Sequence, residues 1–162
     1  NVARSLAVVC GLLGMRFVLA APPEFQFDEP FRRHLGAILP GAEIEETTDP
    51  VAAVKGASCV YTDVWTSMGQ EAERESRLAA FRGYQIDERM LAAASRRAIV
   101  LHCLPAHRGE EITAGVMASA QSAIMDEAEN RLHAQKALIA FLLLAAGSAS
   151  HHHETRLVPT TA

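Results

Sequence analysis

The sequence has few cysteines, no excess of positive charge and no long apolar run, and each shortage excludes a class of protein. Its 162 residues include only three cysteines, Cys10, Cys59 and Cys103. So small and odd a number does not make the disulfide framework of a small secreted domain. Cys10 and Cys59 lie in apolar runs typical of a core, which suits a reducing compartment. We therefore expect a cytoplasmic protein.

Charge and hydropathy exclude two kinds of partner. Fifteen Lys and Arg residues against 19 Asp and Glu give a net charge of -4, so no broad basic face is expected for a nucleic acid. The apolar run from Ala137 to Ala146 is half the length of about 20 residues that a membrane-spanning helix needs. Near the N-terminus, Arg16 interrupts the apolar residues, unlike in a signal peptide. We expect neither nucleic acid nor a membrane as partner.

Short apolar runs typical of buried strands alternate with helical patterns. Strands are expected at 16–21, 42–46, 58–62, 98–101 and 122–125. Helices are expected at 2–13, 30–39, 50–55, 71–82, 87–94 and 127–146. This alternation predicts an α/β fold with a doubly wound, mostly parallel sheet and helices on both faces, a Rossmann-like arrangement. No glycine-rich phosphate loop accompanies it, so only the sheet favours a nucleotide.

We expect one domain over residues 1–146 and a disordered tail over 147–162. The chain starts with a helix, and the first strand of a doubly wound sheet is normally central. We therefore expect that strand to be missing and the edges of its neighbours to be unpaired, which invites association. The tail contains Ser, Thr, Pro and three consecutive histidines, and it is most simply a disordered remnant of cloning.

The first candidate loop follows the expected strand 58–62. Asp63 is followed by Ser67, Met68 and Gly69. A carboxylate, a hydroxyl and backbone N–H groups at a flexible glycine suit a small zwitterion, because the carboxylate binds an ammonium and the N–H groups bind a carboxylate. The competing interpretation is that Asp63 and Ser67 form ordinary turn hydrogen bonds, and on this loop alone that interpretation is favoured.

The second candidate loop follows the strand 98–101. Cys103 stands beside His102, with His107 and Arg108 shortly after. Neighbouring cations predict a lowered pKa for the Cys103 thiol, which then accepts a proton or contacts a ligand in a cleft. The alternative is that Cys103 is a small buried hydrophobe and His102 a satisfied core histidine. Because structural zinc patterns need four regularly spaced ligands, we expect no metal.

A third stretch, EAENR at 127–131, lies where the last strand becomes the long helix. Its acidic residues suit a helix N-terminus. Arg131 is either a solvated surface residue or a planar donor to an anionic substrate.

Together these stretches resemble the ornithine-binding half of the ornithine carbamoyltransferase family. The matching motifs are DVWTSMGQE at 63–71, HCLPAHRGEE at 102–111, EAENR at 127–131 and NVARS at 1–5. The resemblance covers residues 1 to about 146. It implies transfer of a carbamoyl group from carbamoyl phosphate to L-ornithine, giving L-citrulline and phosphate without a cofactor. It also implies a place in arginine biosynthesis and a homo-oligomer, a trimer in the intact family.

The resemblance also implies roles for individual residues. Ornithine's α-amino and α-carboxylate groups would be held by Asn1, Asp63, Ser67 and Met68. Cys103 would lie beside the attacking amine and, with Asp63, help it lose a proton. The Leu104 carbonyl would orient that amine, and Arg131 would contact carbamoyl phosphate.

One departure from the family limits these implications. The N-terminal domain, with its Ser-Thr-Arg-Thr phosphate loop, is absent, so the chain alone is expected to be inactive. Two alternatives stay open: a non-catalytic binding or interaction module that retains the ornithine loops, and a carbamoyltransferase for a related amine.

Overall fold

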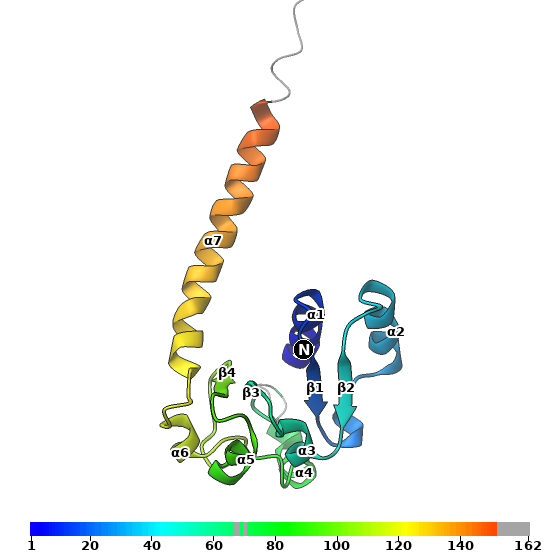
Figure 1. Ribbon diagram of the computed structural model, residues 1–162, viewed down its shortest axis with the longest axis vertical. Helices are drawn as coiled ribbons and strands as arrows, with labels where there is room; N and C mark the ends of the chain where they lie inside the picture. The colour runs from blue at the N-terminus through cyan, green and yellow to red at the C-terminus, as the bar shows by residue number, and fades with distance from the viewer. Residues whose placement is uncertain (67–68, 70, 152–162) are drawn as a thin grey trace, which may run out of the picture. The chain divides into compact units, whose positions relative to one another are not determined.

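The computed structural model describes residues 1–66, 69 and 71–151. Figure 1 shows helices and short strands alternating along the chain. In chain order the elements are α1 (Val2–Leu12), β1 (Phe17–Ala20), η1 (Pro23–Phe25), α2 (Glu29–Ile38), β2 (Ile44–Thr47), α3 (Pro50–Val54), β3 (Cys59–Thr62), η2 (Glu71–Glu73), α4 (Arg74–Ala80), α5 (Glu88–Ala93), β4 (Ile99–His102), α6 (Ala114–Met117) and α7 (Ile124–His151).

The chain divides into two compact units, Asn1–Ile124 and Met125–Ala162. The first contains every strand and all helices from α1 to α6. The second contains nearly all of α7.

Four parallel strands form the sheet structure of the first unit (Figure 1). β1 pairs with β2 in the register Phe17↔Ile44 to Ala20↔Thr47, and β3 pairs with β4 from Cys59↔Ile99 to Thr62↔His102. The predicted α/β class with parallel strands is confirmed. The single sheet is replaced by two pairs.

Local capping signals explain where several helices begin. Asp49 accepts hydrogen bonds from Val51 and Ala52 N–H at 3.0 Å each, and α3 starts at the next residue. Asp87 accepts from Met90 N–H at 2.7 Å and begins α5 in the same way. Both helices begin within one residue of the starts expected from the sequence. A cap favours these starts because it satisfies backbone donors that the first turn leaves free.

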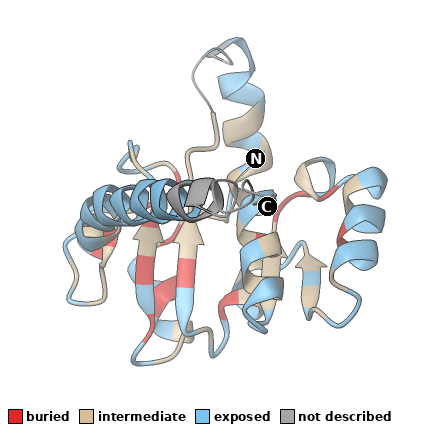
Figure 2. Ribbon diagram, turned by 90° about the horizontal axis from the view of Figure 1, so that it is seen from above, coloured by how far each residue is buried: buried red, intermediate tan, exposed pale blue. Residues whose placement is uncertain are grey.

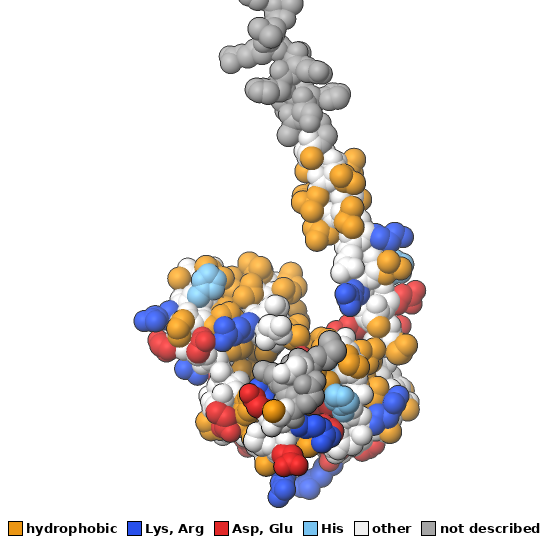
Figure 3. Space-filling model, turned by 180° about the vertical axis from the view of Figure 1, so that it is seen from behind, with side chains coloured by type: hydrophobic (Ala, Val, Ile, Leu, Met, Phe, Trp, Pro, Cys, Tyr) orange, Lys and Arg blue, Asp and Glu red, His pale blue; other side chains and the backbone are white. Residues whose placement is uncertain are grey.

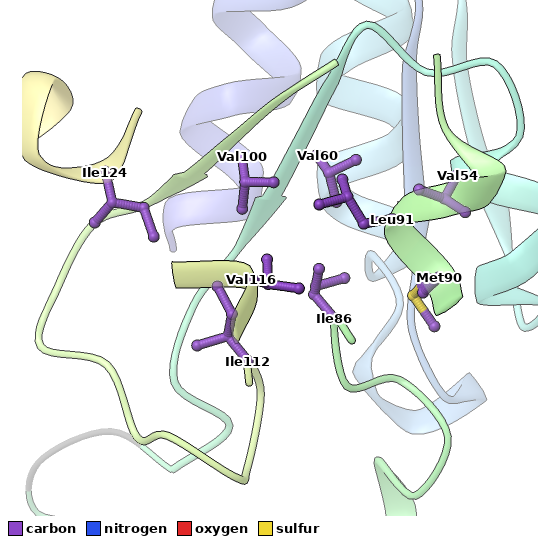
Figure 4. Close-up of a cluster of buried hydrophobic side chains, with 9 residues drawn as sticks. All are labelled: Val54, Val60, Ile86, Met90, Leu91, Val100, Ile112, Val116 and Ile124. Atoms are coloured by element: carbon purple, nitrogen blue, oxygen red, sulfur yellow. The ribbon is translucent and has the colours of Figure 1, made fainter. Parts of the chain in front are cut away.

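The larger hydrophobic core supports the β3–β4 pair. Figure 2 shows buried residues along both of its strands. The members of this core come from β3, β4, the short helices α3, α5 and α6, the segments before α5 and α6, and the first residue of α7 (Figure 4): Val54, Val60, Ile86, Met90, Leu91, Val100, Ile112, Val116 and Ile124. A smaller cluster of Ala7, Phe27 and Leu35 lies with the β1–β2 pair. The strand ends that carry the candidate loops therefore rest on the larger core.

Two sequence predictions are corrected by the packing. The strand expected at 122–125 is a single parallel bridge between Ser122 and Val100, because α7 already begins at Ile124. Cys59, expected in the core, is exposed, since the burial along β3 changes from exposed Cys59 to buried Val60. One side of this strand pair therefore carries the core, as in a half-buried sheet.

Helix α7 continues to His151, beyond the expected end of the domain at residue 146. Figure 3 shows hydrophobic side chains gathered along it. The large exposed ones near its described end are Leu138, Ile139, Phe141, Leu142, Leu143 and Leu144. Within the described part of the chain, no helix combines the length and apolar character needed to cross a membrane.

Candidate functional site

The two predicted loops meet at the carboxyl ends of β3 and β4. Thr62 is the register partner of His102, so the next residues on each strand, Asp63 and Cys103, emerge side by side. The Cys103 thiol donates a hydrogen bond to Asp63 Oδ1 at a Sγ–O distance of 2.9 Å. Residues 40 positions apart are thereby joined where ligand sites of parallel α/β sheets normally lie.

The Asp63–Cys103 contact determines the protonation of the thiol. Burial first, and then the hydrogen bond and negative charge of Asp63, raise the pKa of Cys103 to about 12, although a hydrogen bond with Tyr61 acts in the opposite direction. The expected lowered pKa is therefore wrong, because the thiol's close partner is an anion. At neutral pH Cys103 is a hydrogen-bond donor, and Asp63 is the acceptor.

The loop after Asp63 is held by contacts that sequence reasoning missed. The Trp65 ring stacks on Phe81 with centroids 5.4 Å apart. Arg77 Nη1 donates to the Trp65 carbonyl at 3.2 Å, and the same guanidinium pairs with Glu73. The Glu73–Arg77 ion pair, at i,i+4 spacing, thus also anchors the Trp65 backbone.

The turn after β4 has an unusual backbone. Leu104 has φ 55, in the left-handed region that side-chain-bearing residues seldom occupy. Its N–H donates to His102 Nδ1 at 2.9 Å. The interpretation of His102 as a satisfied core histidine is confirmed, since its side chain is buried and hydrogen-bonded. Cys103 instead is exposed, so it is not a buried hydrophobe.

Beyond this turn, a buried carboxylate holds the loop. Glu111 Oε1 accepts from His107 N–H at 2.5 Å and lies 3.1 Å from His102 Nε2. Burial would raise the pKa of Glu111, but the hydrogen bonds from His102 and His107 outweigh it and lower that pKa. Glu111 is thus ionised in the neutral range. The sequence signal for it was the HCLPAHRGEE motif, where it was not singled out.

One cluster in this loop has the residue types of a metal site. Single ligand atoms of His107, Glu110 and Glu111 lie within 4.8 Å of one another. Glu110, however, forms an ion pair with Arg74, and Glu111 is committed to His102. A cation would have to displace these partners, so the cluster is better explained as part of the loop's own hydrogen bonding.

The sequence also predicts Asn1, Ser67, Met68 and Arg131 as site residues. Asn1 is exposed and caps α1, its side chain accepting from Val2 N–H at 2.7 Å. Arg131 is exposed on α7, in the second unit. Ser67 and Met68 lie outside the described residues. The structure therefore brings together Asp63, Cys103 and Leu104 as one candidate site.

Comparison with known proteins identifies the family. Residues 1–142 match the family described as aspartate/ornithine carbamoyltransferase, Asp/Orn binding domain. The chain belongs to this carbamoyltransferase family. A relative named ornithine carbamoyltransferase, from Thermosynechococcus vestitus, is 53% identical over 145 residues, covering 89% of this chain and 47% of the relative.

Solved structures of carbamoyltransferases also resemble this chain. The crystal structure of ornithine carbamoyltransferase from Gloeobacter violaceus is 48% identical with a TM-score of 0.76, covering 86% of this chain and 47% of that one. A structure of acetylornithine transcarbamylase complexed with acetylcitrulline is 31% identical with a TM-score of 0.74. The match covers 86% of this chain and 43% of that one. The chain spans about half the length of the carbamoyltransferases that it matches.

Proposed function

We propose that the chain is the amino-acid-binding half of an ornithine carbamoyltransferase. The reaction transfers a carbamoyl group from carbamoyl phosphate to the side-chain amine of L-ornithine, giving L-citrulline and phosphate. The observation that carries the proposal is the contact between Asp63 and Cys103 at the ends of the paired strands β3 and β4. It joins two of the four motifs on which the carbamoyltransferase resemblance rests.

The chemistry of the pair suits a diamino acid. Ornithine brings two ammonium groups and one carboxylate, and the ionised Asp63 side chain offers the anionic acceptor that an ammonium needs. Asn1, Ser67 and Met68 are proposed to complete the contacts to the α-amino and α-carboxylate groups. These contacts would fix the substrate and convert a bimolecular encounter into an oriented one.

The transfer step needs a neutral amine. Its nitrogen attacks the carbamoyl carbon, the bond from that carbon to the phosphate oxygen breaks, and phosphate leaves with the electron pair. The amine must give up one proton to become a nucleophile and another as the product forms. Because the pKa of Cys103 is raised to about 12, we assign the first proton to Asp63, the second to the departing phosphate, and a hydrogen-bonding role to the thiol. The Leu104 carbonyl is proposed to orient the amine, and Arg131 to bind carbamoyl phosphate.

The setting of the proposed enzyme follows from the same reasoning. No cofactor is needed for this transfer. We propose a cytoplasmic enzyme of arginine biosynthesis that acts as a homo-oligomer. The exposed apolar side chains of α7 support association, because burying each one contributes about 1.5–3 kcal/mol.

A hybrid enzyme tests the proposal. The N-terminal half of the Gloeobacter violaceus relative is joined ahead of Asn1, and citrulline is measured with carbamoyl phosphate and ornithine. We expect citrulline from the hybrid and none from the 162-residue chain alone, because the chain lacks the phosphate-binding groups. N-acetylornithine, supplied in parallel, is expected to be a poor acceptor.

Two outcomes would contradict this proposal. A folded hybrid that binds carbamoyl phosphate but forms no citrulline would favour a non-catalytic binding module. Preferential transfer to N-acetylornithine would favour the related-amine alternative.

A further inference from the structure

Two buried polar side chains adjoin the turn at Cys103 and Leu104 and have no part in the proposed substrate contacts. His102 is 1% exposed and Glu111 is 0% exposed. We infer that Glu111 is a positioning residue, whose carboxylate acts through His102 to hold the turn that carries the Cys103 thiol and the Leu104 carbonyl. That this turn presents groups to a substrate rests on the proposed function. The hydrogen bonds that hold the turn do not depend on it.

Hydrogen-bond direction fixes the tautomer of His102. The Leu104 N–H donates to Nδ1 at 2.9 Å, so Nδ1 carries no proton. A neutral imidazole then has its proton on Nε2, the nitrogen that lies 3.1 Å from Glu111 Oε1. Glu111 therefore accepts from Nε2–H and selects the tautomer whose other nitrogen can accept from Leu104.

The same carboxylate oxygen holds both ends of the loop. Glu111 Oε1 accepts from His107 N–H at 2.5 Å as well as from His102. The segment between these two residues contains Cys103 and Leu104. One buried atom thus ties the start and the end of the segment that faces Asp63.

These hydrogen bonds matter because the backbone conformation of this turn is unfavourable by itself. Leu104 has φ 55, which a residue with a Cβ adopts only when its surroundings enforce it. His102 Nδ1 holds the Leu104 N–H by a hydrogen bond, and Glu111 holds the His102 ring. The turn thereby places the Cys103 thiol, one residue before Leu104, 2.9 Å from Asp63 Oδ1.

The backbone of Glu111 is anchored independently of its side chain. Its carbonyl accepts from Ile86 N–H at 2.8 Å, and the adjacent Ile112 lies in the larger core. A change confined to the carboxylate therefore leaves these anchors in place. Since both side-chain hydrogen bonds end on one oxygen, a glutamine in this position can still accept both, whereas a methionine can accept neither.

The test compares Glu111→Gln with Glu111→Met in the full chain. Nitrogen NMR of the imidazole reports the His102 tautomer. Alkylation by iodoacetamide at pH 8, followed cysteine by cysteine with mass spectrometry, reports whether Cys103 has left Asp63. Cys10 and Cys59 in the same sample are internal controls, because global unfolding also accelerates the half-buried Cys10, whereas exposed Cys59 reports the reactivity of the reagent.

We expect the Nε2–H tautomer in the unaltered chain and in Glu111→Gln, with Cys103 alkylation within about twofold. In Glu111→Met we expect a mixture of tautomers and Cys103 alkylation at least about tenfold faster, with Cys10 and Cys59 unchanged. If that variant does not fold, His102→Leu and His102→Asn replace it, and only Asn is expected to keep Cys103 slow.

Three results would overturn the inference. The first is an Nδ1–H tautomer in the unaltered chain. The second is a folded Glu111→Met or His102→Leu chain in which Cys103 reacts at its original rate. The third is an equal acceleration of Cys103 alkylation in Glu111→Gln and Glu111→Met, or in His102→Asn and His102→Leu. None of these readouts depends on citrulline formation, so they are separate from the test of the proposed function.

Discussion

At the scale of single residues, the site is governed by one thiol and one carboxylate. Asp63 Oδ1 accepts from Cys103 at 2.9 Å and from Val64 N–H at 2.7 Å. Both contacts hold the Asp63 carboxylate in place, and burial together with that carboxylate disfavours a thiolate at Cys103. Cys103 is consequently a poor base and a poor nucleophile, and the Asp63 carboxylate is the group available to a cationic substrate.

This electrostatic arrangement predicts the pH dependence of Cys103 alkylation. Because the pKa of the thiol is raised to about 12, the thiolate fraction is small at pH 8 and grows about tenfold per pH unit. Replacing Asp63 by Asn removes the negative charge, so the pKa falls and alkylation at pH 8 should accelerate at least about tenfold.

The matched control for this measurement is Glu75→Gln, which removes an exposed carboxylate on α4. We expect it to leave the Cys103 rate unchanged. A Cys103 that reacts at the same rate with and without the Asp63 carboxylate would show that the two groups are not in contact in solution.

At the scale of elements, the β3–β4 pair and its core form the platform under the candidate loops. Val60 and Val100 lie opposite one another in the register, and both are buried. Ile112 lies beside Glu111 and is 0% exposed. Loss of packing here acts on stability and on the position of the loops together.

Two isoleucines separate these effects. Ile112→Ala should lower the free energy of unfolding by about 2–4 kcal/mol, because it removes a fully buried side chain and leaves a cavity. Ile99→Ala, at a position 43% exposed in β4, should lower it by less than about 1 kcal/mol. Urea unfolding measures both, and equal losses would contradict the assignment of the core.

Elements defined by local hydrogen bonds could be predicted from the sequence. Asp49 and Asp87 cap helices with bonds to residues two or three positions away, so the chain itself carries the signal. The loops of the site were found in the same way, since polar residues directly follow apolar strands. Contacts between residues far apart in the sequence could not be predicted from local patterns. The raised pKa of Cys103 depends on burial in the folded chain and on Asp63, 40 residues earlier. The pairing of Glu111 with His102 depends on the path of the loop between them.

The strand expected at 122–125 shows a different limit. Its apolar letters suit a strand, but β-structure requires a neighbour over several residues, and only Ser122 forms a bridge. The same residues also begin a good helix. Periodicity over four residues does not distinguish the two.

At the scale of the whole molecule, we propose that the chain supplies one half of a two-part site. It spans about half the length of the ornithine carbamoyltransferases that it matches. Its described strands form two parallel pairs, β1–β2 and β3–β4. The Asp63–Cys103 contact lies at the ends of the second pair, whereas the groups proposed to bind most of carbamoyl phosphate belong to the other half.

The most direct test of this account is the kcat/KM for ornithine of Asp63→Asn in the hybrid enzyme, measured beside Glu75→Gln. Loss of a charge-assisted hydrogen bond of about 1.5–3 kcal/mol predicts a fall of about 10- to 150-fold for Asp63→Asn. Glu75→Gln should stay within about twofold of the unaltered hybrid. Equal values of kcat/KM for the two folded variants would contradict the placement of ornithine at Asp63 and Cys103.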